Sequence, residues 1–198
     1  MIWFTSDTHL SHKNIIKYCD RPFDDTDHMD ETIIENWNSV VKPEDTVYHL
    51  GDIALGPISE SLAKVARLNG HKIAILGNHD RPFMRAGKPD EQKWWDMYAE
   101  VFQKVVHWRG MLVDIGPNLD TVKVSHFPYE GDHTEIDRYA DVRPHDIGTS
   151  LIHGHTHGSE TLTHSKRGTP MYHVGVDAHN YEPVSETKIL KALGLDKQ

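Results

Sequence analysis

The sequence predicts a single α/β domain whose strands form either one mixed sheet or two packed sheets. Three observations lead to this prediction: the length of the chain, a series of short apolar segments, and amphipathic segments of helical spacing between them. A chain of 198 residues can bury one substantial core. Its contents of 37% hydrophobic and 26% charged residues are ordinary for a globular protein. Residues 1–198 are therefore expected to form one domain.

The expected strands are short segments rich in Val, Ile and aromatic residues, each bounded by glycine or polar residues. This composition is typical of buried strands. The six segments are MIWFTSD, DTVYHLGD, KIAILGNHD, TVKVSHFP, TSLIHGHTH and PMYHVGVD.

The expected helices are segments whose apolar residues recur at helical spacing. Gly70 is a suitable C-cap for the second of them, and the last begins after Ser185 and ends at Gly194. Strand and helix alternate in the first half, which predicts parallel strands joined by right-handed crossovers. From about residue 104 helices are few, which predicts a more meander-like arrangement. The four helical segments are residues 28–41, 58–69, 90–102 and 186–193.

The net charge and the cysteine content limit the expected cellular compartment and the expected binding partners of the protein. The chain carries 21 basic and 30 acidic residues, a net charge of −9, so stable nucleic-acid binding is not expected. The only cysteine in the sequence, Cys19, cannot form an internal disulfide and is interpreted as an inert thiol in a reducing compartment. The sequence contains neither a long apolar run nor the pattern of a signal peptide. We therefore expect a cytoplasmic protein without a membrane partner, and the oligomeric state stays open.

Polar residues with metal-binding side chains follow five of the six apolar segments. In open α/β sheets, ligands bind beyond the carboxyl ends of the parallel strands. The first three segments should therefore deliver their polar residues to one edge, and the later segments join them if their strands reach the same edge. The residues are Asp7, His9, Asp52, Asn78, His79, His126, His155 and His157.

This set combines imidazoles with carboxylates and contains no thiolate. Structural zinc sites are usually rich in cysteine, so that class of site does not fit. The set suits Mn, Fe, Zn, Co or Ni, with Mn favoured here, and it is large enough for two divalent ions. Asp52 is the natural bridge between two ions, and a water shared by both would become a nucleophile. Each motif alone also occurs in ordinary turns, so the prediction depends on the whole series.

The order of these motifs resembles that of the calcineurin-like metallophosphoesterase superfamily, which is D-x-H, GD, GNH[D/E], a lone His and GHxH. Within the superfamily, the chain is similar to the small single-domain phosphoesterases of bacteria and their phages. The resemblance implies a four-layer α/β/β/α sandwich with two packed mixed sheets and a dinuclear metal site at one edge. The motifs here are Asp7-Thr8-His9, Gly51-Asp52, Gly77-Asn78-His79-Asp80, His126 and Gly154-His155-Thr156-His157.

The resemblance also assigns roles to these residues. Asp7, His9 and His157 would hold one metal, Asn78, His126 and His155 the other, and Asp52 would bridge the two. His79 would be the catalytic general acid, with Asp80 orienting its ring, and Asn78 and His79 would contact the substrate. The implied reaction is hydrolysis of a phosphoester by attack of a metal-bridging hydroxide.

Two departures from the family pattern bear on the substrate. IALGP follows Gly51-Asp52, where the protein phosphatases of the superfamily have a phosphate-binding arginine. This absence counts against protein phosphatase activity. A small phosphodiester or nucleotide-type substrate is favoured over a phosphomonoester. A phosphomonoesterase, a nuclease and a metal-binding module without catalysis are the alternatives.

The second departure is the spacing of the first motifs, 45 positions from Asp7 to Asp52 but 26 from Asp52 to Asn78. We interpret residues 11–30 as an inserted loop at the rim of the site. The alternative interpretation of residues 11–30 is a solvated loop with a helical turn. Residues 128–147 are a second candidate rim loop. The candidate substrate contacts in the first loop are His12, Asn14, Lys17 and Arg21.

His153 shares the spacing of His155 and His157 but lies before the glycine of the last motif. We expect it to be a hydrogen-bonded strand residue behind the site and not a ligand.

Overall fold

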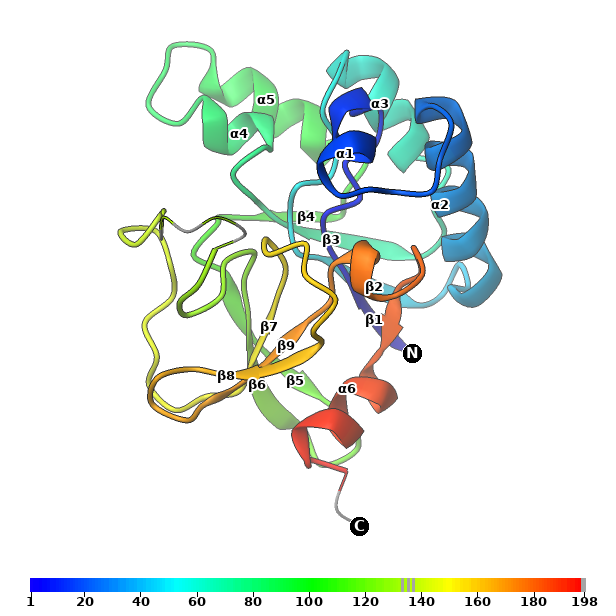
Figure 1. The fold of residues 1–198 in the computed structure, drawn as a ribbon. Coiled ribbons are helices and arrows are strands. Elements are labelled where there is room, and N and C mark those ends of the chain that lie inside the picture. The colour runs from blue at the N-terminus through cyan, green and yellow to red at the C-terminus, as the bar shows by residue number, and fades with distance from the viewer. Residues whose placement is uncertain (133, 135, 137, 197–198) are drawn as a thin grey trace.

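Two β-sheets form the centre of the protein, and a computed structural model describes residues 1–132, 134, 136 and 138–196 (Figure 1). The first sheet has the strand order β10-β1-β2-β3-β4 and the second β5-β6-β7-β9-β8. The first contains β1 (Ile2–Thr5), β2 (Thr46–His49), β3 (His71–Ile75), β4 (Lys104–Val106) and β10 (Val184–Ser185). The second contains β5 (Met111–Ile115), β6 (Asp120–Val124), β7 (Leu151–His153), β8 (Leu162–His164) and β9 (Pro170–His173).

Strands β1 to β4 run parallel, and β10 pairs antiparallel with β1 at the edge. Helices connect each parallel strand to the next, which confirms the alternation of parallel strands and helices predicted for the first half. The predicted helices are present as α2, α3, α5 and α6, and Gly194 ends the last one in the left-handed conformation at φ 69°. The helices are α1 (Lys13–Tyr18), α2 (Thr26–Val40), α3 (Ile58–Val65), α4 (Arg81–Met84), α5 (Glu91–Ala99), α6 (Glu186–Leu193) and the 3₁₀ helix η1 (Val176–Ala178).

The second sheet is not the meander that the shortage of helices predicts. Its hairpin β5–β6 is antiparallel, but β6, β7 and β9 run parallel to one another, and β8 pairs antiparallel with β9. Parallel neighbours need long crossovers. Here the segments 125–150 and 154–169 make these connections, the first without a helix among its described residues.

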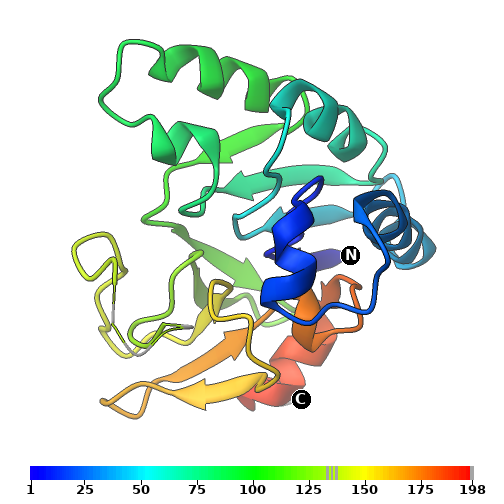
Figure 2. The ribbon, with the colours of Figure 1, turned by 45° about the horizontal axis from the view of Figure 1, so that its top comes forward.

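The main cores lie between the two sheets and between the first sheet and its helices (Figure 2). Side chains of both sheets meet in the inner core, and α6 adds Ile189 and Leu190 to it. On the outer face of the second sheet, Tyr129 of the segment 125–150 packs with Leu151 and Met171. The predicted fold of two packed mixed sheets with helices is confirmed. The fully buried residues of the inner core include Phe4, Leu50, Ile75, Ile115, Val122, Val124, Ile152 and Val174.

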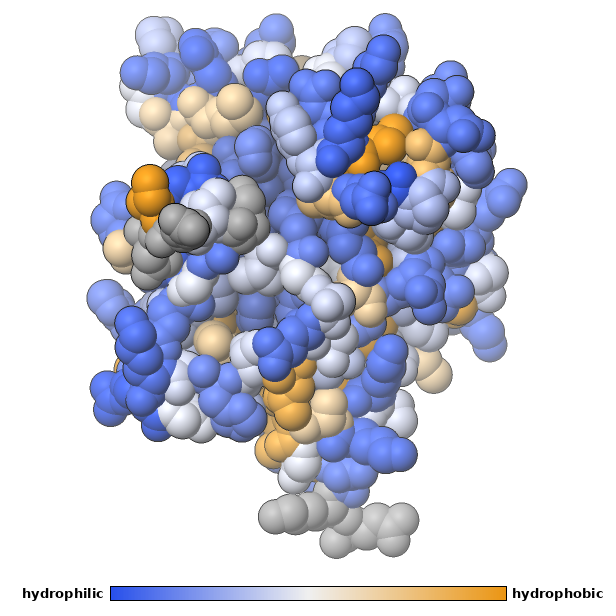
Figure 3. Space-filling view, viewed as in Figure 1, coloured by the Kyte–Doolittle hydropathy of each residue, from blue (hydrophilic) through white to orange (hydrophobic). Residues whose placement is uncertain are grey.

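Residues 11–30, interpreted as an inserted loop, contain the short helix α1 and the start of α2. The side chain of Asp25 caps α2 by accepting from the backbone N–H of His28. Among the described residues, no helix combines the length and apolarity that crossing a membrane requires. Hydrophilic residues cover most of the face seen in Figure 3.

Candidate metal centre

The two sheets bring their parallel carboxyl ends to the same edge of the molecule. Asp7 and His9 follow β1, Asp52 follows β2, and Asn78 and His79 follow β3. From the second sheet, His126 follows β6, and His155 and His157 follow β7. Each predicted ligand is therefore at the end of a parallel strand, and the condition that the later strands reach the same edge is met.

Asp52 lies between side chains that were assigned to different metals. Its Oδ2 is 3.6 Å from Nε2 of His9 and 3.6 Å from Nε2 of His126. Its Oδ1 accepts a 2.8 Å hydrogen bond from the backbone N–H of His79. One oxygen of Asp52 thus lies at equal distance from a ring of each predicted ligand set.

The remaining predicted ligands surround this carboxylate. The donor atoms of Asp7, His9 and His157 all lie within 4.8 Å of one another, as do those of Asp7, Asp52 and His126. Nε2 of His126 is 3.1 Å from Oδ1 of Asn78 and 3.2 Å from Nδ1 of His155. All seven predicted ligands therefore converge, in two adjacent groups.

The burial and protonation of the predicted ligands suit the binding of divalent cations. Nε2 of His9 is buried and has no hydrogen-bond partner among the described residues. Burial lowers the pKa of His9 far below its usual value and that of His155 to about 3, so both imidazoles are neutral, as metal ligands must be. Burial raises the pKa of Asp7. The carboxylates of the site, beside the neutral imidazoles of His9 and His155, can be balanced by bound cations.

The backbone of the site is strained. Five of the seven predicted ligands have a positive φ, a conformation that costs a non-glycine residue on the order of 1–3 kcal/mol. Backbone hydrogen bonds join the strained loops, since the N–H of Asp7 donates to Gly51 and that of His9 donates to Asp52. Such strain is typical of functional sites, where the surrounding structure imposes it. The five φ angles are 59° at Asp7, 49° at His9, 55° at Asp52, 73° at His155 and 51° at His157.

Two glycines of the motifs are required by close packing around the carboxylates. A Cβ on Gly77 would overlap Oδ1 of Asp52, and a Cβ on Gly154 would lie 2.6 Å from Oδ2 of Asp7. Neither position has room for a side chain, which gives the motifs GNHD and GHTH a physical reason for their glycines.

Arg21, predicted to contact substrate, has a different position. Its side chain is buried and its Nε and Nη2 donate to the carboxylate of Asp177 at 2.7 and 3.0 Å. Nη2 also donates to the carbonyl of Asp7 and Nη1 to that of Thr8. The guanidinium thus braces the backbone of the first motif from behind and does not face the pocket.

Asp177 connects this brace to a predicted ligand. Its Oδ2 lies 2.9 Å from Nδ1 of His157. Burial would lower the pKa of His157, but the hydrogen bond with Asp177 and the contact with Cys19 raise it to about 11. Asp177 therefore fixes the ring of His157 with Nε2 toward Asp7, the arrangement that a second carboxylate commonly imposes on a metal-binding histidine.

Asp80 is predicted to orient the ring of His79, but its carboxylate forms hydrogen bonds with other groups. Its carboxylate accepts from the backbone N–H groups of Gly77, Asp52 and Ile53. It also accepts from the hydroxyl of Tyr98, and burial raises its pKa to about 7. Among the hydrogen bonds of the described residues, none joins Asp80 to the His79 ring, because the carboxylate points into the turns of the second and third motifs. Asp80 positions Asp52 through its backbone N–H and the turn before His79 through that of Gly77.

Two of the predicted ligands, His9 and His157, line a cavity of about 410 Å³. His79 and His12 line it, with ring centroids 6.4 Å apart, and Ile15, Tyr18 and Cys19 of the α1 region form one wall. Of the loop residues proposed as substrate contacts, His12 is at the cavity, whereas Asn14 and Lys17 are exposed outside its lining.

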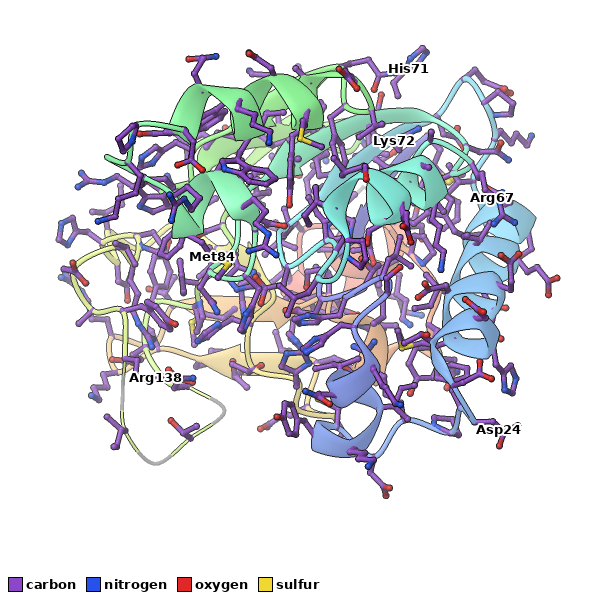
Figure 4. All side chains as sticks on the ribbon, turned by 90° about the horizontal axis from the view of Figure 1, so that it is seen from above. Asp24, Arg67, His71, Lys72, Met84 and Arg138 are labelled. Atoms are coloured by element: carbon purple, nitrogen blue, oxygen red, sulfur yellow. The ribbon has the colours of Figure 1, made fainter. Side chains whose placement is uncertain are left out.

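The segment 128–147 also reaches the cavity, through Arg138. In Figure 4, Arg138 and Met84 lie on one side of the molecule, and Asp24, close to the start of α2, lies on the other. Arg138 pairs with Asp132 at 3.1 Å, and the same carboxylate is 3.4 Å from Nε2 of His155. Asp132 and Arg138 of this segment therefore lie at the rim of the site.

Sequence reasoning missed Asp177 and Asp132. Asp177 follows the sixth apolar segment, PMYHVGVD, so the rule that located the ligands would have indicated it. No spacing or motif singles out Asp132 in its loop.

His153 is the last residue of β7 and is buried, as predicted. Its Nδ1 lies 2.8 Å from the carbonyl oxygen of Gly154, whereas Nε2 has no hydrogen-bond partner among the described residues.

Comparisons with known proteins agree with this geometry. The model of the calcineurin-like phosphoesterase family matches residues 1–159. Gene 66 protein of Mycobacterium phage L5 is 40% identical over 184 residues, covering 89% of this chain and 86% of the phage protein. An uncharacterized protein of Methanocaldococcus jannaschii is 33% identical and covers 97% of this chain and 90% of its own. A solved structure of a protein of unknown function from Aquifex aeolicus is 28% identical, with a TM-score of 0.68, covering 96% of this chain and 98% of its own.

Proposed function

Since this chain belongs to the calcineurin-like phosphoesterase family, we propose that it is a metal-dependent hydrolase that cleaves a small phosphodiester or nucleotide-type substrate. The observation that carries the proposal is the position of Asp52, whose Oδ2 faces His9 and His126 at 3.6 Å each. A phosphomonoester is the second candidate substrate.

We propose that two divalent cations bind in the two adjacent groups of ligands, with Mn favoured. Asp7, His9 and His157 would hold one cation, and Asn78, His126 and His155 the other, with Asp52 between them. When bound, such cations polarise the phosphoryl oxygens and lower the pKa of water. The protein supplies the fixed geometry, through the strained loops and through Asp177 and Asp80 behind the ligands.

His79 is proposed as the general acid that protonates the leaving oxygen. Its backbone N–H is bound to Asp52, and its ring lines the cavity, 5.4 Å from the ring of His9. An imidazole at this position in the cavity can act as the general acid toward a bound ester. Because Asp80 acts on the backbone, the ring of His79 must take its orientation from the cavity and the substrate.

Apart from the proposed metal ligands, the charge of the cavity lining favours a diester over a monoester. A phosphomonoester carries close to two negative charges at neutral pH and a diester one. The cavity lining has one arginine, Arg138, and its charge is already paired with Asp132. His12 adds no positive charge, since burial and the neighbouring His79 lower its pKa to about 4. The residues after Asp52 are the buried apolar Ile53 and Ala54.

The proposal is tested with bis(p-nitrophenyl) phosphate and p-nitrophenyl phosphate, each assayed with Mn, Ni, Co and Zn. We expect turnover to require metal and to be faster for the diester. Faster turnover of the monoester would favour the phosphatase alternative, and inertness toward both would support a binding module.

For His79→Ala we expect a wild-type metal content but slower hydrolysis, most clearly for esters with poor leaving groups. Exposed His71, at the opposite end of β3, gives the control His71→Ala, which should behave as wild type. A metal-loaded His79→Ala protein at full speed on an alkyl ester would exclude the acid role.

A further inference from the structure

His9 and His12 are the two ends of a tight turn that follows β1. The backbone N–H of His12 donates to the carbonyl of His9 at 3.0 Å, and φ is positive at His9 and Ser11, at 49° and 62°. The carboxylate of Asp30, on α2, holds this turn, since both of its oxygens accept from the backbone N–H of Ser11, at 3.1 and 2.9 Å. Asp30 is fully buried and paired with Lys64 at 2.7 Å. The turn therefore keeps the side chains of His9 and His12 next to each other.

The two rings meet through their Nδ1 atoms. Nδ1 of His12 lies 3.3 Å from Nδ1 of His9, and the ring centroids are 5.2 Å apart at an interplanar angle of 43°. A hydrogen bond between two ring nitrogens needs one N–H and one lone pair, so one ring donates and the other accepts. His12 is not a further ligand, because among the described residues the groups of three donors close enough to share an ion include His9 but not His12.

The other nitrogen of His9 decides which ring donates. Nε2 of His9 is buried and has no hydrogen-bond partner among the described residues, and Oδ2 of Asp52 is 3.6 Å away from it. A proton on Nε2 would be a buried N–H without an acceptor, which is costly. A proton on Nδ1 is matched by the lone pair of His12 and leaves a bare lone pair on Nε2, beside the predicted bridging carboxylate. His9 is therefore the donor.

We propose that His12 is a positioning residue for the metal ligand His9: its Nδ1 accepts from Nδ1–H of His9 and so fixes the tautomer that presents the Nε2 lone pair to a cation. The inference rests on the proposed metal binding, and the role comes in addition to the substrate contact expected from the sequence. Metal-binding histidines commonly donate their second ring nitrogen to such a partner. Asp177 is that partner for His157, so both histidines of this predicted metal group have one.

The same hydrogen bond fixes the tautomer of His12. Because its Nδ1 accepts, its proton is on Nε2, and among the hydrogen bonds of the described residues none involves that nitrogen. The ring lines the catalytic cavity beside Tyr18, with ring centroids 6.4 Å apart. His12 can therefore donate to an oxygen of a bound ester, whereas its one acceptor nitrogen is already engaged by His9.

The role is tested by calorimetric titration of the metal-free protein with Mn, in wild type and in His12→Leu and His12→Asn. The two side chains have similar size, but only asparagine places an acceptor, Oδ1, where Nδ1 of His12 lies. In His12→Leu one Mn should bind about 10–100-fold more weakly, and His12→Asn should restore the affinity. Wild-type Mn affinity in His12→Leu, or an equal loss in both variants, would overturn the inference.

The tautomer is tested without metal, from the ¹⁵N resonances of the histidine rings at neutral pH. The resonances of His9, assigned with His9→Phe, should show the proton on Nδ1 in wild type. A His9 ring protonated on Nε2 would contradict the inference. Exposed His71, at the far end of β3, gives the control His71→Leu, which should change neither the Mn affinity nor the His9 resonances.

The failure of this inference and that of the proposed function can be told apart. Weaker Mn binding in His12→Leu with rescue in His12→Asn, in a protein that cleaves neither ester, would support the role of His12 and refute the hydrolase. Metal-dependent cleavage together with wild-type Mn affinity in His12→Leu would refute the role of His12 and leave the hydrolase intact.

Discussion

Replacing Arg21 by methionine should destabilise the protein far more than a surface charge substitution does. Methionine keeps an unbranched side chain of similar reach but removes the guanidinium. That group donates to Asp177 twice, to the carbonyl of Asp7 and to that of Thr8, all in a buried position. It also lies over the ring of Tyr181, 5.7 Å from the centroid.

The expected loss of stability follows from the groups that lose their partner when the guanidinium is removed. Removal of one partner of a buried ion pair costs about 3–5 kcal/mol, because the other charge stays buried without compensation. Asp177 keeps its contact with His157, which places the expected loss toward the lower end. The two backbone carbonyls lose their donors as well, but these losses share one cavity and do not add independently. For a chain of this length, about 3–5 kcal/mol corresponds to a fall in Tm of roughly 6–20 °C.

The assay is equilibrium urea unfolding of the metal-free protein, so that metal binding does not enter the comparison. Arg67→Met is the control, since Arg67 forms a bidentate pair with Glu31 in which both side chains are 49% exposed. Exposed pairs contribute about 0–1 kcal/mol. If Arg21→Met unfolds at the same urea concentration as Arg67→Met, the bracing role is wrong. If it also raises KM, Arg21 contacts substrate as the sequence first predicted.

Two further predictions concern the metal centre and the response to acid. Mn at 100 times its Kd should stabilise the wild-type protein by about 2.7 kcal/mol for each occupied site and raise its Tm by roughly 5–11 °C per site. Asp52→Asn should abolish both this shift and hydrolysis, and a wild-type Mn shift in that variant would contradict the bridging role. Burial lowers the pKa of His49 to about 3, so between pH 6.5 and 3 the unfolded chain binds a proton that the folded chain does not. His49 therefore destabilises the fold as pH falls below 6.5, by about 2–3 kcal/mol at pH 4.5. The free energy of unfolding of His49→Phe should depend less steeply on pH over this interval, and identical slopes would refute the assignment.

The position of the metal centre could be predicted from the sequence because it depends on local order along the chain. A polar residue directly after an apolar strand must lie at that strand's carboxyl end, and parallel pairing brings such ends together. This reasoning located Asp7, Asp52 and Asn78 from the first sheet. For His126 and His155 it required the second sheet to be parallel as well, which composition does not reveal.

The residues that support the ligands were harder to predict because their partners are distant in sequence. Arg21 and Asp177 are 156 positions apart, and they meet only because the end of β9 lies beside the loop after β1. Asp80 was assigned a ring contact by its neighbourhood to His79 in sequence. In space, its carboxylate points back to the turn before it and to the loop of Asp52, which no sequence spacing specifies.

The segment 11–30 is thus more than an insertion at the rim. Asp7 and His9 adopt positive φ angles, and each angle costs on the order of 1–3 kcal/mol unless neighbouring contacts stabilise it. Arg21 donates to the carbonyls of Asp7 and Thr8, within this strained stretch, and hydrogen bonds to charged groups contribute about 1.5–3 kcal/mol each. The two contributions are of the same order as the strain that they oppose. The loop that lengthens the first crossover therefore also fixes the first two ligands, while its other end, at His12 and α1, lines the cavity that the substrate would enter.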